Sequence, residues 1–160
     1  MTERVDFYVL KSATPKQRWI FACRLAEKAY LSDLKVVILQ DDANDAKALD
    51  DLLWTFNERS FVPHELCLDE KFDPATPVHL GLDSSKLPAV DLLVNLTDRL
   101  PGGLDRFTRI AEIMDADPER RRLGRETRGA CAGADTRRLP RRGAKRLAAG
   151  QRVGSSFGVA

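Results

Sequence analysis

Two short apolar runs separated by one amphipathic segment limit the fold of this chain more than any other feature. Residues 5–10 are β-branched and aromatic, and residues 35–40 are almost continuously apolar. Such runs are typical of strands that are covered on both faces, as in a parallel sheet. Between them, Thr14-Pro15-Lys16-Gln17 has a threonine, a proline and a glutamine at the spacing of a capping box, which predicts a helix start. Strand, helix and strand in this order predict a βαβ unit.

Further segments extend this pattern along the chain. The sequence predicts a second helix over residues 45–56, a strand at 91–96, and two short strands at 65–68 and 78–82. A third helix is expected over residues 103–115, where apolar residues recur at helical spacing. They are Leu104, Phe107, Ile110, Ala111 and Met114. The prediction is an α/β fold: a three-layer Rossmann-like domain with a mainly parallel sheet flanked by helices.

The expected helix over 45–56 places one large aromatic side chain outside its core-facing stripe. At about 100° per residue, Ala46, Leu49, Leu53 and Phe56 lie within about 80° of one another. Trp54 lies roughly 130° from the centre of that stripe. A tryptophan in this position either lies flat under the following loop or contacts another protein.

Charge divides the chain into two unlike parts. Residues 1–117 carry 14 Lys and Arg against 21 Asp and Glu, a net charge of −7, whereas residues 118–160 carry 12 against 3, a net charge of +9. The acidic part would repel a phosphate backbone, so only the C-terminal part could attract DNA. We expect no membrane span and no secretory signal, because no apolar run has the necessary length. Three scattered cysteines fit a reducing cytoplasm.

No set of residues in the sequence supports catalysis. The turn at Lys11 to Pro15 contains no glycine, and neither a dinucleotide-binding Gly-rich motif nor a P-loop occurs. Gly102-Gly103 before a predicted helix could bind one anion, but a plain turn is the simpler interpretation. Cys67 follows His64 by three residues, but no second pair of Cys or His completes a zinc motif. A dyad of Cys67 with either histidine is disfavoured because Cys67 lies within a predicted strand. We therefore expect no catalytic residue, no metal and no cofactor.

The stretch from Leu49 to Leu66 is the most distinctive in the chain. It reads LDDLLWTFNERSFVPHEL and resembles the signature of the chi subunit of bacterial DNA polymerase III, which is LD-x-x-LW, a short spacer and SF-[VI]-PH. The resemblance covers about residues 3–126 and implies a clamp-loader accessory protein without a catalytic site. Other segments are also similar to that family: the strand with Phe7-Tyr8, the strands at 36–39 and 91–96, and the expected helix at 107–114.

The resemblance also implies protein partners. In this family, chi joins the clamp loader through the psi subunit or serves a repair helicase, and it holds the acidic C-terminal tail of single-stranded-DNA-binding protein. Contact with DNA would then be indirect. On that pattern Trp54, Phe61 and Pro63 face psi or the helicase, with Val62 and His64 in support. An aromatic side chain beside a proline-stiffened loop suits an interface hot spot.

The site for the acidic tail is implied near the family's C-terminal helix, which continues in the form RE-R-Y. Arg125-Glu126 match this form, and Arg121 lies one turn earlier. Arg121 and Arg125 would share a helix face, and two guanidinium groups there would suit an acidic peptide that ends in a carboxylate. A solvated basic helix end would explain the same pattern.

The resemblance ends near residue 126. Residues 127–160 are rich in Arg, Gly and Ala, contain neither Tyr nor Trp, and have too few apolar residues for a core, so we expect disorder. The sequence thus predicts a chi-like α/β domain at 1–126 and a basic tail at 127–160. An off-frame reading of GC-rich coding sequence would produce such a tail, and translating the neighbouring frame would test this hypothesis. The alternative function is a small α/β protein that binds a nucleotide, or nucleic acid through the tail.

Overall fold

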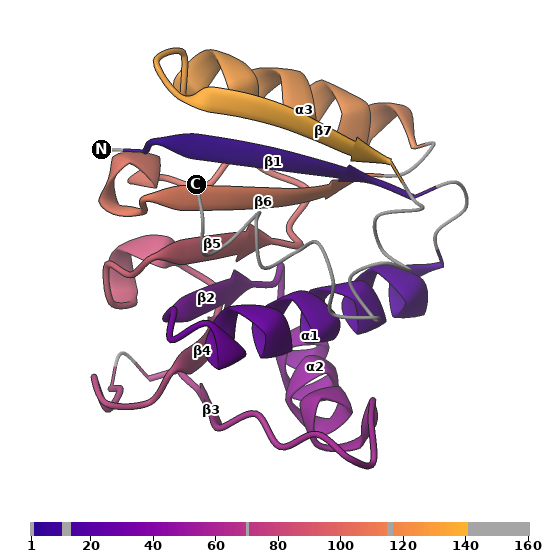
Figure 1. The fold of residues 1–160 in the computed structure, drawn as a ribbon, viewed down its shortest axis with the longest axis vertical. Coiled ribbons are helices and arrows are strands. Elements are labelled where there is room, and N and C mark those ends of the chain that lie inside the picture. The colour runs from indigo at the N-terminus through magenta and orange to yellow at the C-terminus, as the bar shows by residue number, and fades with distance from the viewer. Residues whose placement is uncertain (1, 11–13, 70, 115–116, 141–160) are drawn as a thin grey trace.

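The computed structural model describes residues 2–10, 14–69, 71–114 and 117–140, which form one seven-stranded sheet and the helices around it (Figure 1). The strands are β1 (Arg4–Val9), β2 (Val36–Leu39), β3 (His64–Leu66), β4 (Val78–Gly81), β5 (Leu92–Asn95), β6 (Arg109–Met114) and β7 (Asp135–Pro140). The helices are α1 (Pro15–Leu31), α2 (Ala43–Thr55) and α3 (Pro118–Ala130), with 3-10 turns η1 (Ser84–Lys86) and η2 (Leu104–Arg106).

The strand order is β3-β4-β2-β5-β6-β1-β7, and every described pairing is parallel. Leu25 of α1 and Leu49 of α2 pack on one face of the sheet, in a cluster with Ile38 of β2. Gly124 of α3 lies against Phe7 on the opposite face. The fold therefore has three layers, which confirms the predicted class.

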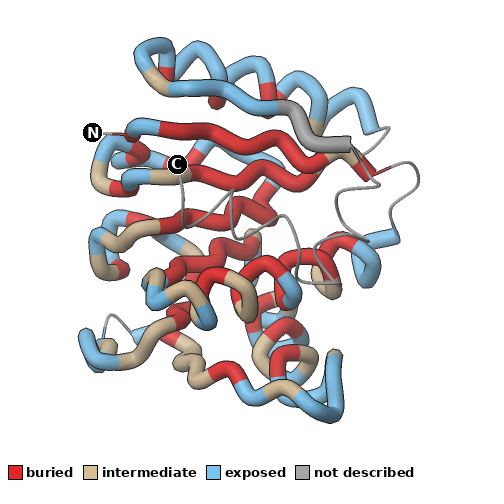
Figure 2. The backbone as a smooth tube through the Cα atoms, in the orientation of Figure 1, coloured by how far each residue is buried: buried red, intermediate tan, exposed pale blue. Residues whose placement is uncertain are grey.

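Apolar side chains explain why the middle of the sheet forms. All four residues of β2, β4 and β5 are buried, and Figure 2 shows this continuous buried centre. The predicted start of α1 is also confirmed. The Thr14 side chain accepts a hydrogen bond from the backbone N–H of Gln17, and the Gln17 side chain accepts one from the backbone N–H of Thr14. This capping box satisfies backbone donors that the first helical turn leaves unpaired.

The helix predicted over residues 103–115 is wrong. Residues 104–106 form only the turn η2, and residues 109–114 form β6 between β1 and β5. Phe107 and Ile110 enter the core on the α3 face, whereas Ala111 and Ile113 enter the core on the other face. A strand that is buried on both faces has an apolar run that also fits helical spacing, so spacing alone could not separate the two.

The C-terminal region contains more regular structure than the sequence indicated. Helix α3 continues past residue 126 to Ala130, and β7 then adds a strand beside β1. The backbone of Asp135 donates a hydrogen bond to the Glu3 carbonyl, which begins this pairing. The rest of the expected tail, residues 141–160, lies outside the described residues. Within the described ranges, no helix has the length and apolar character needed to cross a bilayer.

Candidate binding surfaces

Helix α2 presents Trp54 to the outside of the protein. Its buried stripe is formed by Ala46, Leu49 and Leu53, as the helix geometry predicted. Trp54 lies off this stripe and keeps 52% of its surface exposed. Trp54 packs against Phe61 and His64 of the segment that follows α2, but this contact covers only about half of the side chain and leaves a large aromatic surface open.

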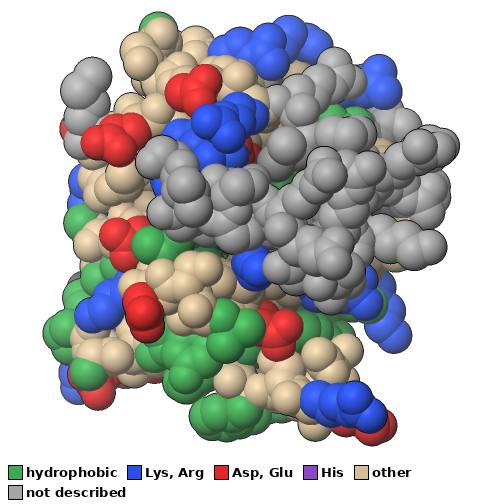
Figure 3. Space-filling model, in the orientation of Figure 1, with side chains coloured by type: hydrophobic (Ala, Val, Ile, Leu, Met, Phe, Trp, Pro, Cys, Tyr) green, Lys and Arg blue, Asp and Glu red, His purple; other side chains and the backbone are tan. Residues whose placement is uncertain are grey.

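Trp54 is the centre of an exposed, largely aromatic surface, which we call the tryptophan patch and define as Trp54, Phe61 and Pro63. The ring centroids of Trp54 and Phe61 are 5.4 Å apart, and those of Trp54 and His64 are 4.6 Å apart. Phe61 is 64% exposed, whereas Pro63 is half-buried. Hydrophobic side chains gather at this end of the molecule in Figure 3, at the bottom of the view. The patch therefore offers a wide apolar area at its surface.

Two residues of the segment at 60–64, Val62 and His64, hold the tryptophan patch in place and add no exposed surface to it. Val62 is buried in the core, so it anchors the loop and adds no surface for a partner. The His64 side chain is fully buried beneath Trp54. Its Nδ1–H donates a hydrogen bond to the Val62 carbonyl at 2.7 Å, and its Nε2 lies 3.1 Å from Asp50 Oδ1. These contacts fix the rotamer of the ring on which the indole rests.

A second surface lies where α3 crosses β1 and β6. A pocket of about 250 Å³ opens there, with Arg121 and Arg125 on its rim. The structure thus brings together the two arginines expected to bind an acidic tail. The complete lining is Phe7, Val9, Met114, Arg121, Gly124, Arg125 and Arg128. We call this site the arginine pocket.

The sequence prediction missed Arg128, which is a third cation of the arginine pocket. Its guanidinium carbon lies 5.2 Å from the centroid of the Phe7 ring, in a cation–π arrangement. The signal was present in the spacing, because Arg128 follows Arg125 by three residues and Arg121 by seven. Such spacings return to one face of a helix. The Gly-rich sequence after residue 126 instead predicts that the helix ends near that residue.

Gly124 keeps the arginine pocket open. A Cβ atom built at this position would lie 2.8 Å from Met114 Cε and 3.4 Å from Phe7. Any side chain would therefore fill the space between α3 and the sheet.

Arg122 lies on the same helix but has a different set of partners, because it pairs with Glu119 at 3.1 Å and with Glu126. Arg122 is not part of the pocket lining.

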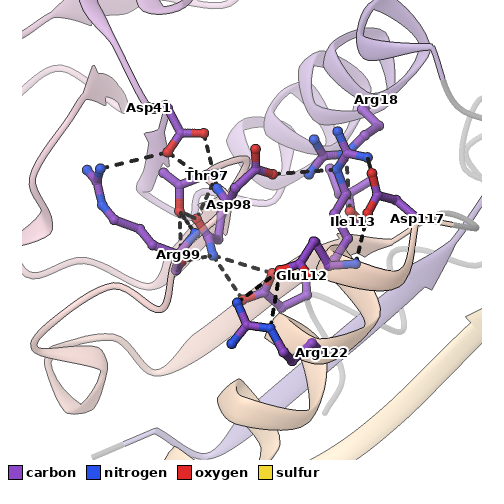
Figure 4. A network of polar contacts seen from close by, with 12 residues as sticks. Arg18, Asp41, Thr97, Asp98, Arg99, Glu112, Ile113, Asp117 and Arg122 are labelled. Atoms are coloured by element: carbon purple, nitrogen blue, oxygen red, sulfur yellow. Dashed lines mark hydrogen bonds and ion pairs between the residues drawn. The ribbon is translucent and has the colours of Figure 1, made fainter.

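A buried carboxyl group, that of Glu112, ties α3 to the sheet and belongs to the polar network drawn in Figure 4. Glu112 Oε1 accepts hydrogen bonds from Asn95 Nδ2 at 3.1 Å and from Thr127 Oγ1 at 2.9 Å. Burial raises the pKa of Glu112 to about 7, against the opposing effects of these two hydrogen bonds and the charge of Arg18. Glu112 is therefore partly protonated near neutral pH.

Replacement of Glu112 by glutamine should reduce the pH dependence of stability. The folded-state pKa of about 7 exceeds the ordinary value of 4.5. The native protein then holds the extra proton between these values, so stability falls as pH rises from about 4.5 to 7. We expect a loss of about 2 kcal/mol across this window, smaller than the full shift because the site relaxes around the charge. Glutamine cannot ionise, so urea unfolding of Glu112→Gln at pH 5 and 7.5 should lack this loss.

The control for this prediction is Glu119→Gln, which removes an exposed carboxylate from the same end of the protein. It should keep the wild-type slope of unfolding free energy against pH. Identical slopes for wild type and Glu112→Gln would show that burial of Glu112 does not control the pH response.

α/β proteins often bind nucleotides at the carboxyl end of the sheet. In this protein, polar side chains at that end form hydrogen bonds to the protein's own backbone. A pocket of about 300 Å³ lies there, next to Ser84 and Arg99. Arg99 Nη2 donates to the Leu82 carbonyl at 2.7 Å, and Ser84 Oγ donates to the Gly102 carbonyl at 2.6 Å. Gly103, with φ of 65°, leads into the single turn η2 instead of the expected α-helix. The nucleotide-binding alternative therefore gains no support from this pocket.

A Cys67–His79 catalytic dyad is also disfavoured by the local chemistry. Burial, together with the smaller effects of the charges of Glu65 and Asp69, raises the pKa of the Cys67 thiol to about 11. A thiol in this state is a weak nucleophile at neutral pH. Cys23 and Cys131 are buried free thiols as well.

The sheet order and its layers define a Rossmann-like α/β protein with an exposed aromatic patch near one sheet edge and an arginine pocket near the other. The family model for the DNA polymerase III chi subunit, HolC, matches residues 1–135. This chain therefore belongs to the chi subunit family of DNA polymerase III. Its relatives are named as that subunit, which is an accessory subunit rather than a catalytic enzyme. The match extends beyond residue 126, the predicted end of the resemblance.

Individual relatives cover most of the chain. It is 41% identical over 123 residues to DNA polymerase III subunit chi of Pseudomonas aeruginosa, covering 77% of this chain and 84% of that protein. It is 30% identical over 127 residues to the Haemophilus influenzae subunit, covering 79% and 88%. The Escherichia coli subunit is 27% identical over 105 residues, covering 65% and 71%.

A solved structure of Saccharomyces cerevisiae Dbp5 bound to RNA and ADP BeF3 has a similar arrangement of elements. The TM-score is 0.61 at 10% identity, covering 92% of this chain and 44% of that one. At this identity the likeness concerns the fold alone. It agrees with the Rossmann-like architecture described above.

Proposed function

We propose that this chi-family protein is a non-catalytic adaptor in DNA replication. One surface joins the clamp loader through psi, or serves a repair helicase, and another holds the acidic C-terminal tail of single-stranded-DNA-binding protein. Contact with DNA is then indirect, through that protein, and takes place in the cytoplasm. Family membership supports the place in the polymerase, and the two surfaces support the partners.

The observation that carries the proposal is the composition of the arginine pocket. Its rim is cationic, with Arg121, Arg125 and Arg128, whereas its floor is apolar, with Phe7 and Met114. Guanidinium groups pair with carboxylates through two parallel hydrogen bonds. An apolar floor takes up an apolar side chain from the same peptide. An acidic tail that ends in a carboxylate and carries an apolar residue would match both parts of the pocket.

The positions of the two surfaces favour bridging. The tryptophan patch lies on α2 and beside β3, at one edge of the sheet, whereas the arginine pocket lies on α3 near β1, next to the other edge (Figure 1). Two partners can therefore bind at once without overlap. Linked weak contacts then gain from effective concentration, because the second binding event becomes intramolecular.

Salt dependence tests the electrostatic part of the proposal. Affinity for a fluorescent tail peptide should fall steadily between 50 and 300 mM salt, because guanidinium–carboxylate pairs at an exposed rim are screened. Fluorescence anisotropy of the full chain measures this change. A scrambled peptide of the same charge serves as the control for non-specific attraction to the basic C-terminal part. An affinity that does not change with salt would contradict recognition by the arginine pocket.

A further inference from the structure

The outer pair of strands, β3 and β4, places three metal-ligating side chains on one face of the sheet. Glu65 pairs in register with His79, and Cys67 follows two residues later, so all three side chains point to the same side. A carboxylate oxygen of Glu65, the sulfur of Cys67 and a ring nitrogen of His79 lie within 4.8 Å of one another. Cys67 packs with Phe72 on the face opposite α1 and α2.

The histidine of this cluster has one ring nitrogen without a hydrogen-bond partner. His79 Nε2 lies 2.9 Å from the Asp73 carbonyl and 3.5 Å from Glu65 Oε2, and both oxygens accept hydrogen bonds, so Nε2 carries the proton. The lone pair is then on Nδ1, which is buried and has no hydrogen-bond partner among the described residues. Histidines that bind metals usually donate their other N–H to a carbonyl or carboxylate in this way. A buried unpaired acceptor is costly, and a cation would satisfy it.

The other two donors are also arranged for a cation. Glu65 Oε2 accepts a hydrogen bond from the backbone N–H of Asp73 at 2.9 Å, so the same loop residue holds both Glu65 and His79. Cys67 is only 6% exposed. The charged groups that act on the Cys67 sulfur are the carboxylates of Glu65 and Asp69. This local field favours a positive ion.

We propose that Glu65, Cys67 and His79 form a binding site for a thiophilic divalent cation of the zinc class. Sulfur, imidazole nitrogen and carboxylate oxygen are the donors that zinc prefers, with water in the fourth position. On binding, the Cys67 S–H bond breaks, its proton goes to solvent and a sulfur–metal bond forms, with no transfer of electrons. Donors of a tetrahedral site lie roughly 3.5 Å apart. Because the donors lie within 4.8 Å of one another, a contraction of roughly 1.3 Å at most would bring them to this spacing.

The sequence alone did not show this cluster, because its donors do not follow one another at helical or hairpin spacing. Cys67 and His79 are twelve residues apart and belong to different strands. Parallel pairing of β3 with β4 brings them together.

Titration of the full chain with Co²⁺, after treatment with a chelator and a reductant, tests the site. We expect a near-ultraviolet thiolate-to-cobalt charge-transfer band that saturates at about one equivalent and disappears on addition of Zn²⁺. The band should be absent in Cys67→Ser. It should remain in Cys131→Ser, the matched control, because Cys131 is a free thiol with similar exposure, 7%. Glu65→Gln should weaken the apparent affinity at least tenfold.

A second readout is independent of the absorption band. Zn²⁺ should raise the melting temperature of the wild type, EDTA should reverse the increase, and Cys67→Ser should not respond. Circular dichroism verifies the fold of each variant, and if Cys67→Ser does not fold, the half-buried Glu65→Gln decides. Absence of the band in the wild type, or an equal band in Cys67→Ser, would overturn the proposal.

Discussion

Exchange of Arg121 and Arg125 for glutamate should weaken binding of the acidic tail peptide by at least a hundredfold. Hydrogen bonds to charged groups contribute about 1.5–3 kcal/mol each. Loss of two such interactions, with repulsion added, exceeds the roughly 2.7 kcal/mol that a hundredfold change requires. Both side chains are exposed on α3, so the fold should tolerate the change. Isothermal titration calorimetry with the tail peptide measures the loss.

Arg122→Glu is the matched control for this prediction. It makes the same charge change in the same helix, but Arg122 pairs with Glu119 and Glu126 and does not line the arginine pocket. Its effect on peptide affinity should therefore be small. A comparable loss in this control would show that net charge, rather than the arginine pocket, attracts the peptide.

Replacement of Trp54 by alanine should cost about 2–4 kcal/mol in binding to psi or to the helicase, a thirtyfold loss of affinity or more. The indole is half exposed and packs on Phe61 and His64, so its removal takes away the centre of the tryptophan patch. The core stripe of α2 does not include Trp54, and the fold should remain intact. Surface plasmon resonance with the purified partner measures the change.

Leu31→Ala provides the comparison for Trp54→Ala, because Leu31 is a large apolar side chain that is 70% exposed at the end of α1. It should leave partner affinity unchanged. The Trp54 variant should in turn bind the acidic tail peptide normally, since the arginine pocket lies near the other edge of the sheet. Unchanged partner affinity in Trp54→Ala would remove Trp54 from the interface.

The elements that were predicted well have a local cause. The capping residues of α1 and the outward direction of Trp54 follow from helix geometry within a few residues, and both are confirmed. The expected helix over residues 103–115 failed because burial on both faces is not a local property. Whether an apolar run becomes a strand or a helix there depends on the strands that flank it.

The sequence by itself determined the class of the fold and the family of the protein, because apolar strand-length runs and the segment from Leu49 to Leu66 are continuous in the chain. The tertiary structure alone decided which side chains act together. It placed the arginine-bearing face of α3 over Phe7 of β1, and it placed His79 of β4 beside Glu65 of β3. Such groups come from separate elements, and only the pairing of parallel strands and the packing of α3 on them sets their distances.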